Sequence, residues 1–119
     1  MEKQMNDLED IRQQLLKFRD LRDWKQFHDP KNLAEAISIE AGELLEHFLW
    51  KTVEESKNLP EEDLSKISQE IADIFIFLLY LSTELQIDLL ESVKGKIELN
   101  DKKYPAEKAR GTSKKYQNL

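Results

Sequence analysis

Two pairs of acidic residues, each pair spaced three positions apart, are the part of the sequence best suited to chemistry. Glu40 and Glu43 form one pair, and Glu70 and Asp73 form the other. This spacing places both carboxylates of a pair on one face of a helix, and here that face also carries the apolar stripe. Two inward pairs that face each other would repel unless cations lay between them. Because carboxylate oxygens suit Mg²⁺ or Mn²⁺ rather than zinc, the pattern predicts a divalent-cation site.

Two other interpretations of these acids stay open. The chain has 24 Asp and Glu among 119 residues, so the pairs could arise by chance and lie in solvent. A di-iron bundle would instead need Glu-x-x-His motifs, and His47 follows Glu43 by four positions rather than three. We expect His47 near the end of its helix, where a cation is favoured. Gly42 lowers helix stability by up to ~1 kcal/mol relative to alanine, which suggests the close approach of an ion, a ligand or another helix.

The elements that must position these acids are predicted to be helices. Apolar residues at helical spacing predict helices over four segments, at about 6–21, 30–51, 60–85 and 88–103. Asn6, Asp29 and Asp88 are predicted N-caps, and Pro105 ends the last helix. With only 3 Gly and 3 Pro, the sequence lacks the turns of a many-stranded β protein. The predicted fold class is therefore all-α, as a four-helix bundle.

The third predicted helix is apolar nearly all round beyond Asp73, which predicts burial on several sides. A chain of 119 residues can hardly surround such a helix alone, so we expect a homo-oligomer, a dimer or a tetramer. We expect the domain to span residues 1–105 and a polar, flexible tail to span 106–119. Basic residues outnumber acidic ones between Lys94 and Lys115, which makes this end locally positive.

Composition and charge exclude some classes of binding partner. A net charge of −6 disfavours binding to nucleic-acid polymers. The longest apolar run, residues 74–81, is far shorter than the ~20 residues of a membrane span. The chain has no cysteine, and its first residues show no signal-peptide pattern. We therefore expect a cytoplasmic protein with neither a membrane nor a nucleic-acid polymer as its partner.

Aromatic residues cluster in the first predicted connection, at Trp24, Phe27 and His28, and Trp50 closes the second segment. Such rings could stack on a nucleotide base, which contributes ~1–3 kcal/mol per base. Alternatively, Trp24 and Phe27 could hold the first helix against the core.

The residues around the acids carry a more specific signal. The informative segments are Phe18–His28 (FRDLRDWKQFH), Pro30–Leu33, Gly42–Glu46 leading to Trp50–Lys51, Lys96 with Asn100, and Lys103–Pro105. With these residues, the chain resembles the MazG-type all-α nucleoside triphosphate pyrophosphohydrolases, and within them the dCTP pyrophosphatase-like branch. The resemblance covers about residues 8–105.

This resemblance implies an activity and a set of roles. It implies Mg²⁺-dependent hydrolysis of (deoxy)nucleoside triphosphates to the monophosphate and pyrophosphate, on dCTP-like or modified pyrimidine nucleotides, as nucleotide pool sanitation. The implied metal ligands are Glu40, Glu43, Glu70 and Asp73, with Mn²⁺ as a possible substitute for Mg²⁺. One of these carboxylates, or Glu46, would orient or deprotonate the attacking water. A non-catalytic helical module for dimerisation or partner binding is the alternative function.

The resemblance also implies substrate contacts. Trp24 and His28 would line the base pocket, with Trp50 beside them. Phe77 stands where this branch usually carries a tyrosine, so a hydroxyl contact to sugar or phosphate is missing and the preferred nucleotide is open. The implied contacts to phosphate or sugar are Lys96, Asn100, Lys103 and Tyr104.

Overall fold

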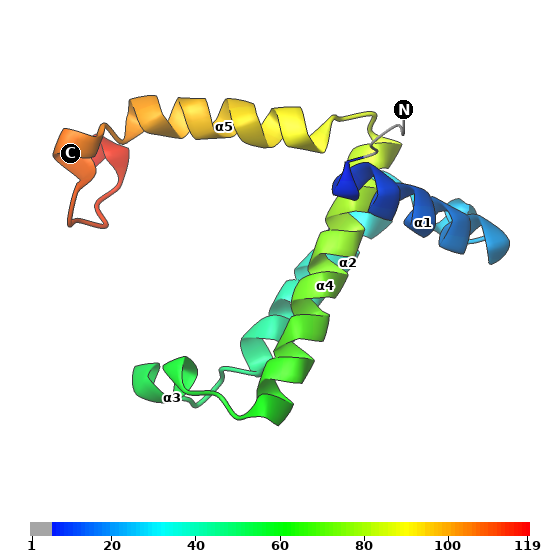
Figure 1. The fold of residues 1–119 in the computed structure, drawn as a ribbon, viewed down its shortest axis with the longest axis horizontal. Helices are drawn as coiled ribbons and strands as arrows, with labels where there is room; N and C mark the ends of the chain where they lie inside the picture. Colours follow the sequence, from blue (N-terminus) through cyan, green and yellow to red (C-terminus); the bar gives the residue numbers. More distant parts are fainter. Residues whose placement is uncertain (1–5) are drawn as a thin grey trace, which may run out of the picture. The chain divides into compact units, whose positions relative to one another are not determined.

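Helices are the only regular secondary structure in residues 6–119, the part of the chain that the computed structural model describes. In chain order the elements are α1 (Asp7–Leu21), the 3₁₀ turn η1 (Lys25–Phe27), α2 (Pro30–Glu46), α3 (Val53–Lys57), α4 (Glu61–Glu84), α5 (Leu89–Lys103), α6 (Ala106–Ala109) and the 3₁₀ turn η2 (Tyr116–Asn118) (Figure 1). The predicted all-α class is confirmed. None of the helices in this part of the chain is long and apolar enough to cross a membrane.

The chain divides into two compact units, and the boundary lies between Gln86 and Ile87. In the first unit, α2 and α4 lie side by side and run antiparallel (Figure 1). The helix α1 is fixed to the carboxyl end of α4, where the Tyr80 hydroxyl donates a hydrogen bond of 2.8 Å to the Leu15 carbonyl. This unit carries all four predicted metal ligands.

The predicted helix starts are confirmed. The side chain of each predicted N-cap accepts a hydrogen bond from the backbone N–H three residues later, at 2.7 Å for Asn6, 2.9 Å for Asp29 and 3.1 Å for Asp88. These bonds satisfy backbone donors that a helix leaves free in its first turn.

The predicted end of the second helix near Lys51 is wrong. The helix α2 ends at Glu46, and α3 begins behind Thr52, whose side chain and that of Glu55 form a capping box. After Glu46 the backbone N–H groups of His47, Phe48 and Leu49 bond three residues back, as in a turn, and the φ of 69° at Trp50 keeps the chain out of the helical conformation before the capping box starts α3. The consequence is that Trp50 lies in a turn rather than on a helix face.

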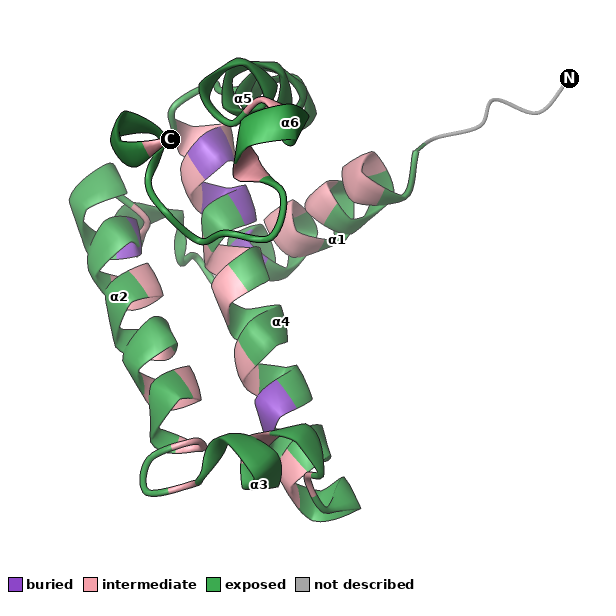
Figure 2. Ribbon diagram, turned by 90° about the vertical axis from the view of Figure 1, so that its left-hand side faces the viewer, coloured by how far each residue is buried: buried purple, intermediate pink, exposed green. Residues whose placement is uncertain are grey.

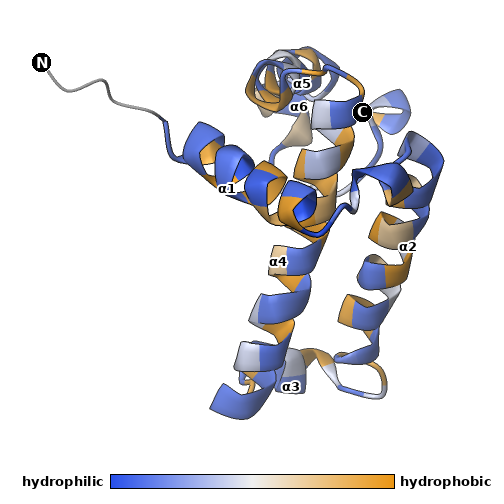
Figure 3. Ribbon diagram, turned by 90° about the vertical axis from the view of Figure 1, so that its right-hand side faces the viewer, coloured by the Kyte–Doolittle hydropathy of each residue, from blue (hydrophilic) through white to orange (hydrophobic). Residues whose placement is uncertain are grey.

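The hydrophobic core of the first unit is a narrow seam. Hydrophobic residues follow the facing sides of α2 and α4 (Figure 3), and the buried ones are Leu33, Ile67, Leu79 and Tyr80 (Figure 2). Ile71, Phe75 and Leu78 of α4 stay exposed. The several-sided burial expected for this helix is therefore not found within its own unit, and the homo-oligomer stays a prediction.

The second unit contains α5, α6 and η2. The ring of Tyr116 meets that of Tyr104 edge-on, with centroids 6.0 Å apart, and the Lys103 ammonium lies 5.1 Å from the Tyr116 ring centroid. Residues 106–119 thus contain α6 and η2 and return to the end of α5. Their flexibility in solution stays a prediction.

Candidate metal centre

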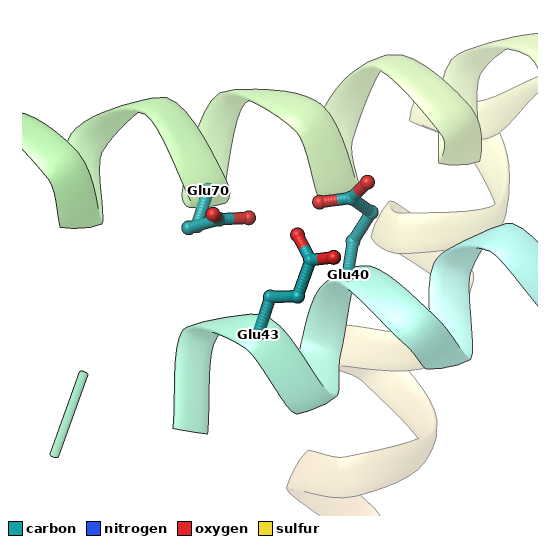
Figure 4. A group of neighbouring side chains, drawn as sticks. All are labelled: Glu40, Glu43 and Glu70. Atoms are coloured by element: carbon teal, nitrogen blue, oxygen red, sulfur yellow. The ribbon is translucent and has the colours of Figure 1, made fainter. Parts of the chain in front are cut away.

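The carboxylates of Glu40, Glu43 and Glu70 meet between α2 and α4 (Figure 4). One carboxylate oxygen from each residue lies within 4.8 Å of one from each of the others. Glu40 and Glu43 come from the same face of α2 because they are three positions apart, and Glu70 comes from the middle of α4. The structure therefore brings together three of the four predicted metal ligands, which we call the acidic cluster.

The other two predicted acids lie outside the acidic cluster. Asp73 is exposed on α4, one turn beyond Glu70, and its negative charge still acts on Glu40. Glu46 is the last residue of α2 and is also exposed. Their roles as a metal ligand and as a base for the attacking water stay predictions.

The acidic cluster is electrostatically unfavourable without a cation. Burial, the neighbouring carboxylates of Glu70 and Glu43, and the charge of Asp73 together raise the pKa of Glu40 from 4.5 to about 7, with burial as the largest cause. The Oε2 atoms of Glu40 and Glu70 are buried and have no hydrogen-bond partner. An unpartnered buried polar group costs about 1–3 kcal/mol, and more when it is charged. A cation between the helices would remove this cost.

The donor set fits a hard divalent cation. It consists of carboxylate oxygens, which Mg²⁺ and Mn²⁺ prefer. Among residues 6–119, no lysine or arginine forms an ion pair with a member of the acidic cluster. The negative charge is thus left for a metal ion to balance.

His47 is a neighbour of the acidic cluster that the sequence pattern did not predict. Its Nε2 atom lies 3.7 Å from Oε1 of Glu70, and the two side chains are 25% and 19% exposed. The residue is indeed at the end of α2, as its C-cap. It follows Glu43 by four positions and therefore lies on the same helix face, and this spacing could have predicted that His47 lies near the carboxylates.

Two predicted base-pocket residues pack against different partners. The Trp24 ring meets Phe18 of α1 edge-on with centroids 5.7 Å apart, and both side chains stay exposed. The His28 ring lies 4.5 Å from the Tyr80 ring, and its Nδ1 is buried without a hydrogen-bond partner. Burial lowers the pKa of His28, and the positive charge of Arg19 lowers it further.

The remaining predicted substrate residues occupy three places. Trp50 is 92% exposed in the turn after α2, and Phe77 is half-buried on α4. The other four are exposed residues of α5 and its C-cap, in the second unit: Lys96, Asn100, Lys103 and Tyr104.

Gly42 faces open space, since an added Cβ would meet nothing within 4 Å. The expected close approach of another helix at Gly42 is therefore wrong within this chain.

Comparison with known proteins gives the family. Human dCTP pyrophosphatase 1 is 40% identical over 114 residues, which cover 94% of this chain and 67% of the human protein. The mouse protein of the same name is 38% identical over the same length. The crystal structure of a pyrophosphatase from Archaeoglobus fulgidus DSM 4304 is similar with a TM-score of 0.82 at 40% identity, and the match covers 88% of this chain and 98% of that one. Residues 36–119 match the model of the MazG-like family. The predicted class of enzyme is confirmed, and the chain belongs to the MazG-like family.

Proposed function

We propose that this chain hydrolyses nucleoside triphosphates to a nucleoside monophosphate and pyrophosphate, with Mg²⁺ bound at the acidic cluster. The observation that carries this proposal is the group of three carboxylates in which Glu40 and Glu70 each keep a buried oxygen without a partner. Similarity to proteins named dCTP pyrophosphatase 1 supports the reaction type and points to dCTP-like or modified pyrimidine substrates.

The residues of the acidic cluster would hold the metal, with Asp73 as the fourth ligand and Mn²⁺ as a possible substitute. When bound, Mg²⁺ supplies charge neutralisation of the phosphates and lowers the pKa of water. The protein then has to orient one water toward the α-phosphorus and accept its proton. We assign this task to Glu46 or to a carboxylate of the cluster, so that no protein nucleophile is needed.

Substrate recognition would come from the aromatic residues and the basic end of the chain. Trp50 is a candidate for stacking on the base. Its ring is almost fully exposed to water and its backbone has a positive φ, and both features cost free energy that binding of a base would offset. Trp24 and His28 precede α2 and Trp50 follows it, so these residues lie at opposite ends of a helix about 25 Å long. A base pocket that contains all three would therefore take them from different copies of the chain, while Phe77 offers no hydroxyl to the sugar. The phosphate or sugar contacts would be Lys96, Asn100, Lys103 and Tyr104. We place the catalytic domain in residues 1–105 and propose that it works as a homo-oligomer.

Product analysis tests the proposal. The full chain is incubated with Mg²⁺ and each of the common dNTPs and NTPs, and the products are separated by ion exchange, with EDTA in place of Mg²⁺ as the control. We expect dCTP to give dCMP and pyrophosphate only when metal is present. Release of orthophosphate and a diphosphate, or no turnover of any nucleotide, would contradict the proposal. A non-catalytic module would show no Mg²⁺-dependent change in melting temperature.

A further inference from the structure

The imidazole of His47 lies next to the acidic cluster and has no task in the proposed reaction. The residue closes α2, where its backbone N–H lies within hydrogen-bonding range of the carbonyls of Leu44 and Leu45. Its side chain extends toward α4, and Nε2 lies 3.7 Å from Oε1 of Glu70. That distance is longer than a hydrogen bond but within the range of an electrostatic contact. Within residues 6–119, His47 is the basic side chain that lies within 4 Å of a carboxylate oxygen of the acidic cluster.

The two carboxylate oxygens of Glu70 have different surroundings. Oε1 faces His47, whereas Oε2 is buried and has no hydrogen-bond partner. A carboxylate held through one oxygen keeps the other in a fixed direction. Carboxylates that bind metals are commonly held in this way by a neighbouring donor, and removal of that donor typically weakens metal binding 10- to 100-fold.

We infer that His47 is a positioning residue that holds Glu70 through Oε1 and leaves Oε2 free for the divalent cation. This inference rests on the proposed function, because it assigns the cation to the acidic cluster. The task needs a proton on Nε2, which both the neutral Nε2–H form and the charged form of the ring supply. His47 does not join the three carboxylates whose oxygens lie within 4.8 Å of one another, so it acts through Glu70 rather than on the ion.

Three variants separate this role from the other effects of His47. His47→Leu removes the donor and keeps the bulk, and His47→Gln restores an N–H donor at nearly the same reach. Lys51→Met is the matched control. Lys51 forms an ion pair of 3.4 Å with Asp63 of α4, and the two side chains are 26% and 33% exposed. Its loss removes a similar contact near the same end of α2 without touching Glu70.

Metal affinity without nucleotide is the main measurement. Mn²⁺ is titrated into each full-length variant, free Mn²⁺ is counted by electron paramagnetic resonance, and Mg²⁺ is then added as a competitor. We expect His47→Leu to bind Mn²⁺ at least about tenfold more weakly than the unmodified chain. His47→Gln should regain most of that loss, and Lys51→Met should bind as the unmodified chain does. Circular dichroism checks that each variant is folded.

The chain has only two histidines, which gives a second measurement on the unmodified protein. With ¹⁵N-labelled histidine, Mg²⁺ should shift the ring nitrogen signals of His47 and leave those of His28 in place.

Several results would overturn the inference. These are unchanged Mn²⁺ affinity in His47→Leu, a His47→Gln variant as weak as His47→Leu, or ring signals of His47 that ignore Mg²⁺. If the unmodified chain binds no Mn²⁺, both this inference and the proposed metal site fail. If it binds Mn²⁺ in a His47-dependent way but hydrolyses no nucleotide, only the proposed reaction fails.

Discussion

The helix α4 carries half-buried charge at two places, and the two are built in opposite ways. Near its carboxyl end, Glu84 accepts a hydrogen bond of 3.3 Å from Arg19, which also donates one of 2.9 Å to Asp20. In its middle, Glu70 faces Glu40 and Glu43, which carry the same charge. The first place, which we call the arginine cluster, pairs carboxylates with a guanidinium. Among residues 6–119, the acidic cluster has no lysine or arginine partner.

This difference separates a structural role from a binding role. In the arginine cluster, the Arg19 side chain is only 8% exposed but has two carboxylate partners, and the nearby Tyr80 hydroxyl is satisfied by a backbone carbonyl. These groups hold α1 on α4 without any further partner. The nearby Nδ1 atom of His28 is buried and unpartnered, but burial lowers the pKa of that ring and keeps it neutral. The acidic cluster leaves two buried carboxylate oxygens unpartnered among groups that repel one another, so it is the place that needs a ligand.

The largest expected effect comes from Glu40→Gln, which should strongly reduce turnover but leave the chain folded. We expect turnover of dCTP to fall by about 10²–10³-fold, because one ligand oxygen and its charge are lost at the reacting centre. The free energy of unfolding without Mg²⁺ should stay the same or rise, since repulsion within the acidic cluster is relieved. Turnover and urea unfolding are measured on the same preparation.

The matched control is Glu35→Gln, on the same helix, whose exposed side chain pairs with Lys31. It should keep both turnover and stability. A Glu40→Gln enzyme within threefold of full turnover would mean that the acidic cluster is not the reaction site.

Arg19→Met should have the reverse effect in the arginine cluster, with loss of stability and no loss of metal binding. We expect the free energy of unfolding to fall by about 2–3 kcal/mol, because Glu84 is left half-buried without its partner. The affinity for Mn²⁺ should not change. Urea unfolding and Mn²⁺ titration together check this pair of outcomes.

The double variant Arg19→Met with Glu84→Gln tests the cause. It should recover part of the lost stability, because no unpaired charge then remains. If Arg19→Met instead weakens Mn²⁺ binding at unchanged stability, the division into a structural and a binding cluster is wrong.

Local signals in the sequence predicted the starts of α1, α2 and α5 and the common face of two carboxylates that meet in the acidic cluster. Cap residues such as Asn6 and Asp29 act within three positions, so their effect can be recognised without tertiary structure. The spacing of Glu40 and Glu43 likewise fixes their common face. The end of α2 was missed, although the Thr52–Glu55 capping box is a local signal that could have located the start of α3.

The pairings between distant segments could not be predicted in this way. Arg19 and Glu84 are 65 positions apart, and the contact of His47 with Glu70 depends on how α2 and α4 are aligned. Periodicity shows which face of a helix is apolar but not which polar groups meet across two helices. For the same reason, it could not show that Asp73 lies outside the acidic cluster.

The pH dependence of stability should show the unfavourable charge of the acidic cluster directly. The pKa of Glu40 is raised from 4.5 to about 7 in the folded chain, so the folded state holds its proton more tightly than the unfolded state. The resulting stability is fully present below pH 4.5 and is lost as the pH rises through about 7. We expect a loss of about 1–2 kcal/mol without metal, reduced from the full shift because the site is partly solvated.

Urea unfolding at pH 5 and pH 8, each with and without Mg²⁺, measures this loss. Mg²⁺ should restore stability at the higher pH, and the difference from Glu40→Gln isolates the part due to Glu40. His28 works in the opposite direction, because its lowered pKa makes the folded chain resist protonation. Its contribution is fully present above pH 6.5 and is lost as the pH falls through the lowered pKa. An unmodified chain and a Glu40→Gln variant with the same pH dependence would remove the electrostatic argument for a metal.

The smallest expected effect, from Gly42→Ala, asks whether the face of α2 beside the acidic cluster has an occupant in solution. An added Cβ at Gly42 meets nothing within 4 Å, and the same holds for Gly95 in α5. Each glycine-to-alanine substitution should therefore raise the free energy of unfolding by about 0.5–1 kcal/mol, since alanine loses less backbone entropy than glycine when the helix folds. Gly95 serves as the control because it too lies within a helix and faces open space, away from the acidic cluster. If both gain stability and keep dCTP turnover, the space at Gly42 is simply solvent. If Gly42→Ala alone loses turnover or changes the oligomeric state in light scattering, then nucleotide or a second copy of the chain occupies that space, and the binding region of the molecule extends along α2 beyond its carboxylates.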